Sequence, residues 1–216
     1  MRERAITGNM VTGIVLAGGL SRRMGGGDKT LIDVAGRPML SYVIERLAPQ
    51  TGAVVINANG DAERFASFEL PVVADTVGEF PGPLAGVLAG LRWAQIHTPA
   101  ASHVVSVSGD APLFPTNLVA EFRKAIGETP GAIAMARSDG HVHPVIGLWP
   151  VTLADDLETA LREGTRKVLV WTDRHDVRVV DFPPGHLGGV AFDPFFNANR
   201  PEDLERLEAL LGGGPQ

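Results

Sequence analysis

The chain has 216 residues, of which 44% are hydrophobic and 20% are charged, and its formal net charge at pH 7 is -6. The length suits one domain or two small ones, the composition supports a packed core, and the acidic balance argues against a general nucleic-acid-binding protein. The absence of cysteine excludes disulfides, thiolate nucleophiles and cysteine-based metal centres, and it fits a reducing cytoplasm.

No stretch approaches the roughly 18 apolar residues that a membrane-spanning helix needs. The apolar run 10–17 follows Arg2 and Arg4, as the core of a signal peptide would. However, the run is short, contains Gly13 and is followed closely by two arginines, so we reject that interpretation. We expect a cytoplasmic protein with neither membrane nor nucleic acid as a partner.

The first half of the chain alternates apolar runs with amphipathic segments. We predict buried strands over residues 11–17, 54–56, 70–73 and 103–108. We predict helices over residues 38–47, 62–67, 84–91 and 118–126. Pro38 is expected at the first position of its helix, where the missing N–H costs nothing.

The second half is less regular. Residues 132–136 and 145–149 predict two strands, and the turn at 138–140 between them has hairpin chemistry, which allows one strand to run antiparallel. A helical stripe precedes residues 168–172, whose pattern suits either a helix or a strand. A late strand over 177–182 and a terminal helix over 201–211 complete the chain. We expect one domain over residues 1–216, with an α/β fold and a mostly parallel sheet covered on both faces.

The most informative stretch is Leu16-Ala17-Gly18-Gly19-Leu20-Ser21-Arg22-Arg23-Met24-Gly25-Gly26-Gly27-Asp28-Lys29. It follows a buried strand directly, and its glycines allow backbone N–H groups to approach a ligand closely. Its arginines and lysine supply positive charge against the acidic total, which indicates a phosphate-binding loop.

Two common phosphate-binding loops do not fit this stretch. A P-loop has glycine immediately before its lysine, whereas Asp28 precedes Lys29 here. The dinucleotide fingerprint Gly-x-Gly-x-x-Gly has no match between Gly18 and Gly27.

Polar residues follow the other predicted strands. Asn57 follows the second, Asp75 the third and Asp110 the fourth. Because parallel strands share one carboxyl edge, these side chains should meet the glycine loop in one cleft.

The glycine stretch resembles the signature of the molybdenum cofactor guanylyltransferases, in its Leu-Ala-Gly-Gly start, its Arg23-Met24-Gly25 turn and its Asp28-Lys29 end. The resemblance continues in order through Asn57, Asp75, 81–86, 110–112, 143–144 and 196–199 followed by Pro201. It implies a Rossmann-like nucleotidyltransferase fold of the glycosyltransferase-A type, a three-layer sandwich with an antiparallel strand in the sheet.

The reaction implied by the resemblance joins GTP and molybdopterin, or its molybdenum form, to give the guanine dinucleotide cofactor and pyrophosphate. The part of the chain up to about residue 115 would bind the nucleotide, and the rest would face the pterin. We also expect transient contacts with molybdoenzyme maturation proteins.

Roles for the individual residues follow as hypotheses. Leu16, Ala17, Gly18 and Gly19 would surround the triphosphate, with Arg23 and Lys29 supplying positive charge. Asp110 would hold Mg²⁺, for which Mn²⁺ is an alternative because oxygen ligands suit both. Asn57 and Asp75 would lie at the nucleoside, and Asn197 and Asn199 would lie toward the pterin or the metal. We assign Arg23, Lys29 and Asp110 to catalysis.

Plainer interpretations stay open for several residues. Gly82 and Gly86 serve either a ligand-facing turn or close helix packing. Asn59 is more typical of a turn, and His141 and His143 suit a hairpin or a substrate-facing role better than a metal pair.

Two rival functions remain. A cytidylyltransferase acting on the same pterin typically has Leu-Ala-Ala-Gly and Arg-Phe-Gly, whereas this chain has Gly18 and Met24. A non-catalytic nucleotide-binding protein of the same fold is the second rival, and the presence of both Lys29 and Asp110 speaks against it.

Overall fold

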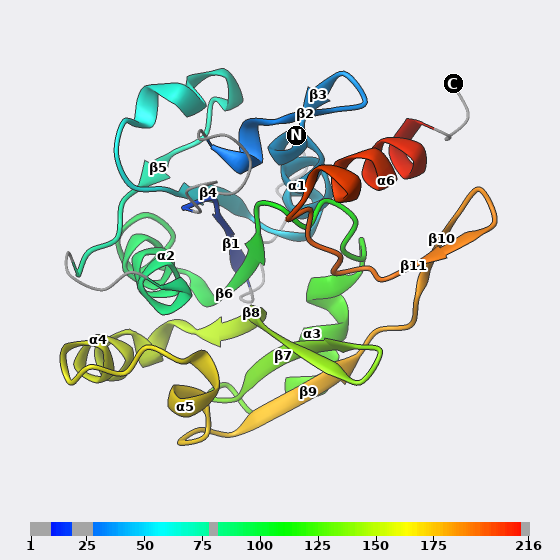
Figure 1. Cartoon of the computed structure of the whole chain (residues 1–216). Helices are drawn as coiled ribbons and strands as arrows, with labels where there is room; N and C mark the ends of the chain where they lie inside the picture. Colours follow the sequence, from blue (N-terminus) through cyan, green and yellow to red (C-terminus); the bar gives the residue numbers. More distant parts are fainter. Residues whose placement is uncertain (1–9, 19–27, 78–81, 213–216) are drawn as a thin grey trace, which may run out of the picture.

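The structure is a computed structural model, and it describes residues 10–18, 28–77 and 82–212 (Figure 1). A seven-stranded sheet runs through the centre in the order β5-β4-β1-β6-β8-β7-β9. The strands of this sheet are β1 Met10–Leu16, β4 Ala53–Asn57, β5 Val72–Val73, β6 Ala101–Ser108, β7 Ile133–Ser138, β8 His141–Pro150 and β9 Val177–Asp181. Only β8 runs antiparallel to its neighbours, which confirms the predicted α/β class and mostly parallel sheet.

Helices cover both faces of the sheet. The helices are α1 Met39–Leu47, α2 Pro83–His97, α3 Leu118–Ile126, α4 Ala154–Arg162, α5 Val168–Thr172 and α6 Pro201–Gly212, with short 3-10 helices η1 Lys29–Leu31, η2 Ala48–Gln50, η3 Ala62–Phe68 and η4 Val151–Leu153. Apolar side chains of α1, η3 and α3 form the core on one face, and those of α2, α4 and α5 form the core on the other. The two cores explain why the central strands are apolar on both sides.

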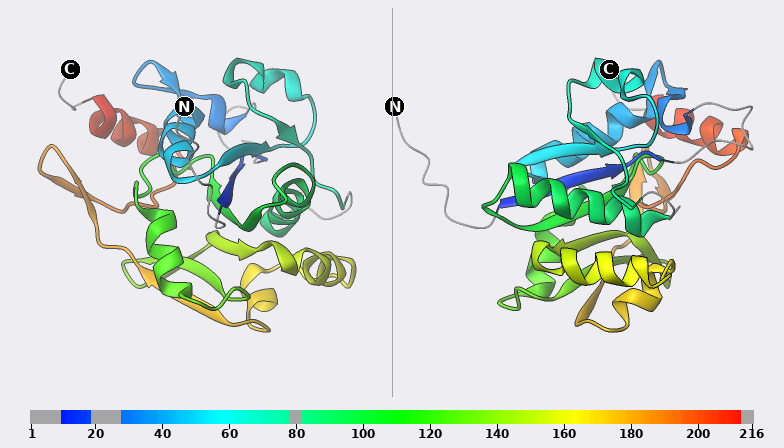
Figure 2. Two further views of the ribbon diagram at one scale, coloured as in Figure 1. Left: turned by 180° about the vertical axis from the view of Figure 1, so that it is seen from behind. Right: turned by 90° about the vertical axis from the view of Figure 1, so that its left-hand side faces the viewer.

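Two small ribbons and the last helix complete the molecule. The ribbons are β2 Asp33–Val34 with β3 Arg37–Pro38, and β10 Gly185–Leu187 with β11 Val190–Phe192. The β10–β11 ribbon projects from the body, and α6 lies beside β2 and α1 (Figures 1 and 2). The C-terminal part of the chain therefore returns to the half that carries the glycine loop.

Two local predictions change in the structure. Pro38 does not begin a helix, because it pairs with Asp33 in the β2–β3 ribbon and keeps an extended ψ of 135°, so α1 begins at Met39. The ambiguous segment 168–172 is helical, because Val168 and Trp171 pack into the core beside Trp149. The third predicted strand is shorter than expected and pairs over Val72–Val73 alone.

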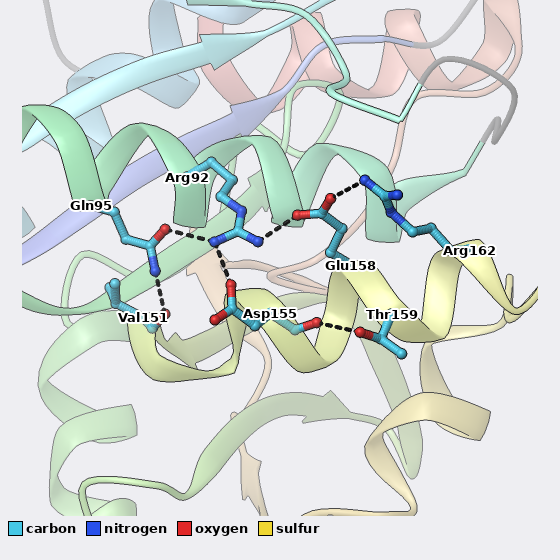
Figure 3. A network of polar contacts seen from close by, with 7 residues as sticks. All are labelled: Arg92, Gln95, Val151, Asp155, Glu158, Thr159 and Arg162. Carbon is cyan, nitrogen blue, oxygen red and sulfur yellow. Dashed lines mark hydrogen bonds and ion pairs between the residues drawn. The ribbon is translucent and has the colours of Figure 1, made fainter.

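Helices α2 and α4 are joined by a polar network (Figure 3). The guanidinium of Arg92 donates to Asp155 at 2.7 Å and to Glu158, which also accepts from Arg162 at 2.5 Å. Hydrogen bonds from Arg92 and then from Arg162 lower the pKa of Glu158. The network fixes α2 against α4, and the N-terminus of α2 borders the cleft described next.

In the described ranges, no helix combines the length and the apolar character needed to cross a bilayer.

Candidate active site

A cleft of about 310 Å³ lies at the carboxyl ends of β5, β4, β1 and β6. Its lining consists of Leu16, Gly18, Asn57, Asn59, Asp75, Gly82, Pro83, Ser108 and Val145. The four strands are adjacent and parallel, so the residues that follow them reach the same edge of the sheet. The predicted convergence of Asn57 and Asp75 on a common cleft with Gly18 is therefore observed. Asp110, predicted in the same cleft, does not line it and lies next to it, where it accepts from Ser108.

One end of the cleft is built from two amides and a carboxylate. Asn57 Nδ2 donates to Asp75 Oδ1 at 3.0 Å, and Asn59 Nδ2 donates to Asp75 Oδ2 at 2.8 Å. Asn57 also donates to the carbonyl of Val73 at 3.2 Å and is 5% exposed. This end offers carboxylate oxygens held by neutral donors.

Glycine-mediated packing sets the position of Asn57. A Cβ on Gly86 would lie 2.3 Å from Asn57 Oδ1 and 2.7 Å from Leu16 Cδ2, so α2 approaches the strand ends only because residue 86 has no side chain. Gly82 lines the cleft at the start of the same helix. Of the two interpretations left open, close helix packing applies to Gly86, and a position at the cleft applies to Gly82.

A second polar cluster lies next to Ser108, which lines the cleft, and the ammonium group of Lys29 is at its centre. Lys29 Nζ donates to Asp110 Oδ2 and to Asn199 Oδ1, each at 2.6 Å. The other carboxylate oxygen of Asp110 accepts from Ser108 Oγ at 2.5 Å. The cluster unites residues that are 81 and 170 positions apart in the sequence.

Backbone contacts hold this cluster against β1. The N–H of Gly109 donates to the Leu16 carbonyl at 3.0 Å, and the N–H of Ala198 donates to the Asp110 carbonyl at 3.1 Å. A Cβ on Gly109 would lie 2.7 Å from Thr30 Cγ2, so glycine is required where η1 meets the end of β6. The segment that carries Asn199 is thereby attached to the turn that carries Asp110.

The remaining predicted residues have different outcomes. Ala17 is buried, and its N–H donates to the Asn57 carbonyl at 2.9 Å, so that group is already used within the sheet. Asn197 is part-buried, and its Oδ1 has no hydrogen-bond partner among the described residues. Gly19 and Arg23 lie outside the described residues.

Asp28 links the end of the glycine stretch to the amide end of the cleft. Its carboxylate pairs with Arg64, whose Nη2 donates to the Asn59 carbonyl at 2.8 Å. Asp28 makes no side-chain cap on η1, so its carboxylate serves this ion pair instead.

The His141–His143 pair belongs to a hairpin network. His143 Nε2 lies 2.7 Å from Ser138 Oγ, which donates to Asp193 Oδ1 at 2.7 Å. Because that hydroxyl proton is used toward Asp193, His143 donates from Nε2. Burial lowers the pKa of His143, and the charge of Asp193 opposes that shift. Serine stands between histidine and carboxylate here, unlike in a hydrolytic triad, where histidine is central.

Within residues 10–18, 28–77 and 82–212, no group of three or more histidine, cysteine, aspartate or glutamate side chains could hold a metal ion. His141 Nδ1 is bonded to the Asp139 carbonyl at 2.7 Å, which supports the hairpin interpretation.

Sequence reasoning missed two contributors, Asn59 and Ser108. The sequence pattern that could have indicated Asn59 is the Asn-x-Asn spacing at the end of β4. Residues two apart in an extended chain point to the same side, so Asn59 is expected on the side of Asn57. For Ser108 it is the Ser-x-Asp pattern where β6 ends in a turn.

Comparisons with known proteins identify the family of the chain. A family model described as a MobA-like NTP transferase domain matches residues 13–178. The molybdenum cofactor guanylyltransferase of Bradyrhizobium sp. (strain ORS 278) is 52% identical over 205 residues, which cover 94% of each chain. That of Rhizobium meliloti (strain 1021) is 46% identical and covers 92% of this chain and 90% of its own.

The chain belongs to the molybdenum cofactor guanylyltransferase family.

Solved structures share the fold of this chain. The molybdopterin-guanine dinucleotide biosynthesis protein A of Archaeoglobus fulgidus superposes with a TM-score of 0.70 at 26% identity, covering 93% of this chain and 98% of its own. The 4-diphosphocytidyl-2C-methyl-D-erythritol synthase of Anaerococcus prevotii has a TM-score of 0.67 at 13% identity, over 95% of this chain and all of its own, which shows the fold alone. This member of the guanylyltransferase family is thus a nucleotidyltransferase of molybdenum cofactor biosynthesis with the predicted nucleotidyltransferase fold.

Proposed function

We propose that this enzyme transfers GMP from GTP to the terminal phosphate of molybdopterin, or of its molybdenum form, and releases pyrophosphate. One observation carries the proposal. A carboxylate held by two amides stands at one end of a cleft, and a lysine–aspartate pair adjoins the same cleft through Ser108. A nucleoside triphosphate requires both features at once, an acceptor for the base and charge for the phosphates. The names of the curated relatives favour guanine as the base.

The amide–carboxylate end suits guanine by its chemistry. Guanine presents two donors on one edge, N1–H and the exocyclic amine, and a carboxylate accepts two parallel hydrogen bonds well. Cytosine and adenine each present a ring-nitrogen acceptor on the corresponding edge, which a carboxylate repels. Asp75, at 3.0 Å and 2.8 Å from the amides of Asn57 and Asn59, is the acceptor that we assign to guanine.

The transfer step needs no protein nucleophile. An oxygen of the terminal phosphate on the pterin attacks the α-phosphorus of GTP and forms a new P–O bond. The bond from the α-phosphorus to the bridging oxygen breaks, and pyrophosphate leaves with the electron pair. The attacking phosphate is already anionic near neutral pH, so the enzyme contributes position and positive charge rather than a general base.

Lys29 and Asp110 take complementary roles in this proposal. Lys29 is half of an ion pair at 2.6 Å with side chains 11% and 18% exposed, so its ammonium is held against Asp110, which accepts from the cleft-lining Ser108. A triphosphate would accept from that ammonium and free Asp110 Oδ2. Asp110 would then hold Mg²⁺, or Mn²⁺, which neutralises phosphate charge when bound.

The donor set fits a magnesium ion that arrives with its nucleotide. Among the described residues, Asp110 belongs to no group of three or more His, Cys, Asp or Glu side chains, so the protein ligands alone are too few for a resident metal. Mg²⁺, however, is commonly held by one or two carboxylates together with substrate phosphates and water. Gly18 would present its backbone to the phosphates, and Gly19 and Arg23 keep their predicted roles there.

The deciding experiment incubates the enzyme with molybdopterin, Mg²⁺ and each of the four NTPs, and identifies the dinucleotide by mass spectrometry with pyrophosphate release in parallel. We expect the guanine dinucleotide and stoichiometric pyrophosphate from GTP alone. A cytosine dinucleotide would replace the proposal by the cytidylyltransferase alternative. GTP binding without pyrophosphate release would identify a non-catalytic nucleotide-binding protein.

A further inference from the structure

Asn59 forms two hydrogen bonds to one residue at the same end of the cleft. Its Oδ1 accepts from the backbone N–H of Asp75 at 2.9 Å, and its Nδ2 donates to Asp75 Oδ2 at 2.8 Å. The side chain thus closes a ring with both the backbone and the carboxylate of Asp75. The orientation of the amide is unambiguous, because its oxygen faces a donor and its nitrogen faces a carboxylate.

The two asparagines divide the carboxylate between them. Asn57 Nδ2 donates to Asp75 Oδ1, whereas Asn59 Nδ2 donates to Oδ2. With one donor on each oxygen, the plane of the carboxylate is fixed. Each oxygen can accept a second hydrogen bond, and Asp75 lines the cleft where a base would supply it.

The backbone of Asn59 is held as well. Its carbonyl accepts from Arg64 Nη2 at 2.8 Å, and Arg64 pairs with Asp28, next to Lys29. Asn59 is therefore anchored to the segment that carries Lys29 on one side and to Asp75 on the other. A turn residue would need neither the amide donor nor a partner 16 positions away.

We propose that Asn59 is a positioning residue for base selection, which aims the Asp75 carboxylate so that it accepts both the N1–H and the 2-amino group of guanine. The inference rests on the proposed function, since it takes GTP as the substrate. If the Asp75 carboxylate lost this orientation, the two parallel hydrogen bonds from guanine would weaken more than the single hydrogen bond from a base without the 2-amino group. Discrimination between GTP and ITP, which lacks only the 2-amino group, should therefore fall.

The test compares two substitutions with opposite demands. Asn59→Ala removes both hydrogen bonds. Asn59→Asp keeps the acceptor for the Asp75 N–H but replaces the amide donor by a second carboxylate, which repels Asp75. Asn117→Ala is the matched control, because Asn117 lies at the exposed start of α3 and makes no side-chain cap.

Dissociation constants for GTP and ITP with Mg²⁺ are measured by calorimetry on the full chain, and thermal unfolding verifies that each variant is folded. We expect the GTP-to-ITP affinity ratio to fall about threefold in Asn59→Ala and about tenfold or more in Asn59→Asp, with ITP binding nearly unchanged in the alanine variant. The control should keep the wild-type ratio.

Two failures are distinguishable. If the wild-type enzyme binds GTP no better than ITP, the assignment of guanine to Asp75 in the proposed function is wrong. If the wild type prefers GTP but Asn59→Asp keeps that preference, Asn59 only shapes the turn and the inference is wrong.

Discussion

Gly86 is the position where one methyl group tests the geometry of the site. A Cβ added there would lie 2.3 Å from Asn57 Oδ1 and 2.7 Å from Leu16 Cδ2. Asn57 is 5% exposed and bonded to Asp75 and to Val73, so its amide cannot turn away without losing those partners. We expect Gly86→Ala to move Asn57 and disturb the carboxylate that it holds.

The magnitude follows from three opposing effects. Overpacking a close contact costs about 1–3 kcal/mol, and an unsatisfied buried amide adds about 1 kcal/mol. Alanine in place of glycine in a helix returns about 1 kcal/mol. The net loss is about 2 kcal/mol, which for a chain of this size lowers Tm by roughly 4–8 °C. GTP affinity should fall about tenfold, because the displaced amide borders the base end of the cleft.

Two matched variants isolate the cause. A Cβ on Gly90, one turn further along α2, would lie 2.7 Å from Ile14 Cδ1 in the apolar core, so Gly90→Ala should lose stability while GTP affinity stays unchanged. Gly212→Ala at the last residue of α6 adds a methyl group with nothing within 4 Å, so it should not lower stability and should leave GTP affinity unchanged. The assays are thermal unfolding and calorimetric GTP titration. Wild-type stability and affinity in Gly86→Ala would refute the reasoning.

Two further predictions concern the charged residues. Lys29→Ala should lower the transfer rate at least about tenfold with the fold intact, because one charged hydrogen bond to phosphate is worth about 1.5–3 kcal/mol. Lys124→Ala, at an exposed lysine, is the control. Near-normal turnover of Lys29→Ala in steady-state kinetics would contradict the assignment. The pKa of His143 is lowered by burial. As pH falls through about 6.5, the unfolded chain therefore binds more protons than the folded chain. The contribution of His143 to stability is present above that pH and is lost as pH falls below it. His143→Gln should therefore show a flatter dependence of unfolding free energy on pH between about 7 and 5 than the wild type, and parallel curves from urea titrations would disprove the effect.

The amino-acid sequence by itself determined the fold class and the edge at which the site is built. Buried apolar runs alternate with amphipathic segments, and that pattern is local. Since the carboxyl ends of parallel strands share an edge, Asn57 and Asp75 could be placed near Gly18 without coordinates. The family, the enzyme class and the nucleotidyltransferase fold are confirmed by the comparisons. The roles of the site residues, the single-domain assignment and the cytoplasmic location remain predictions.

Only the tertiary structure decided the contacts between distant segments. The meeting of Lys29 with Asp110 and Asn199, and the closed ring between Asn59 and Asp75, depend on strand order and on the returning C-terminal segment. Local propensity carries no information about such pairs. For that reason the sequence predicted a turn residue at Asn59 and a helix start at Pro38. The prediction for 168–172 was ambiguous for the same reason, because its apolar side chains fit the periodicity of a helix or of a strand. The helix is decided by packing against Trp149. Sequence pattern thus places polar groups at an edge, while packing decides which of them touch.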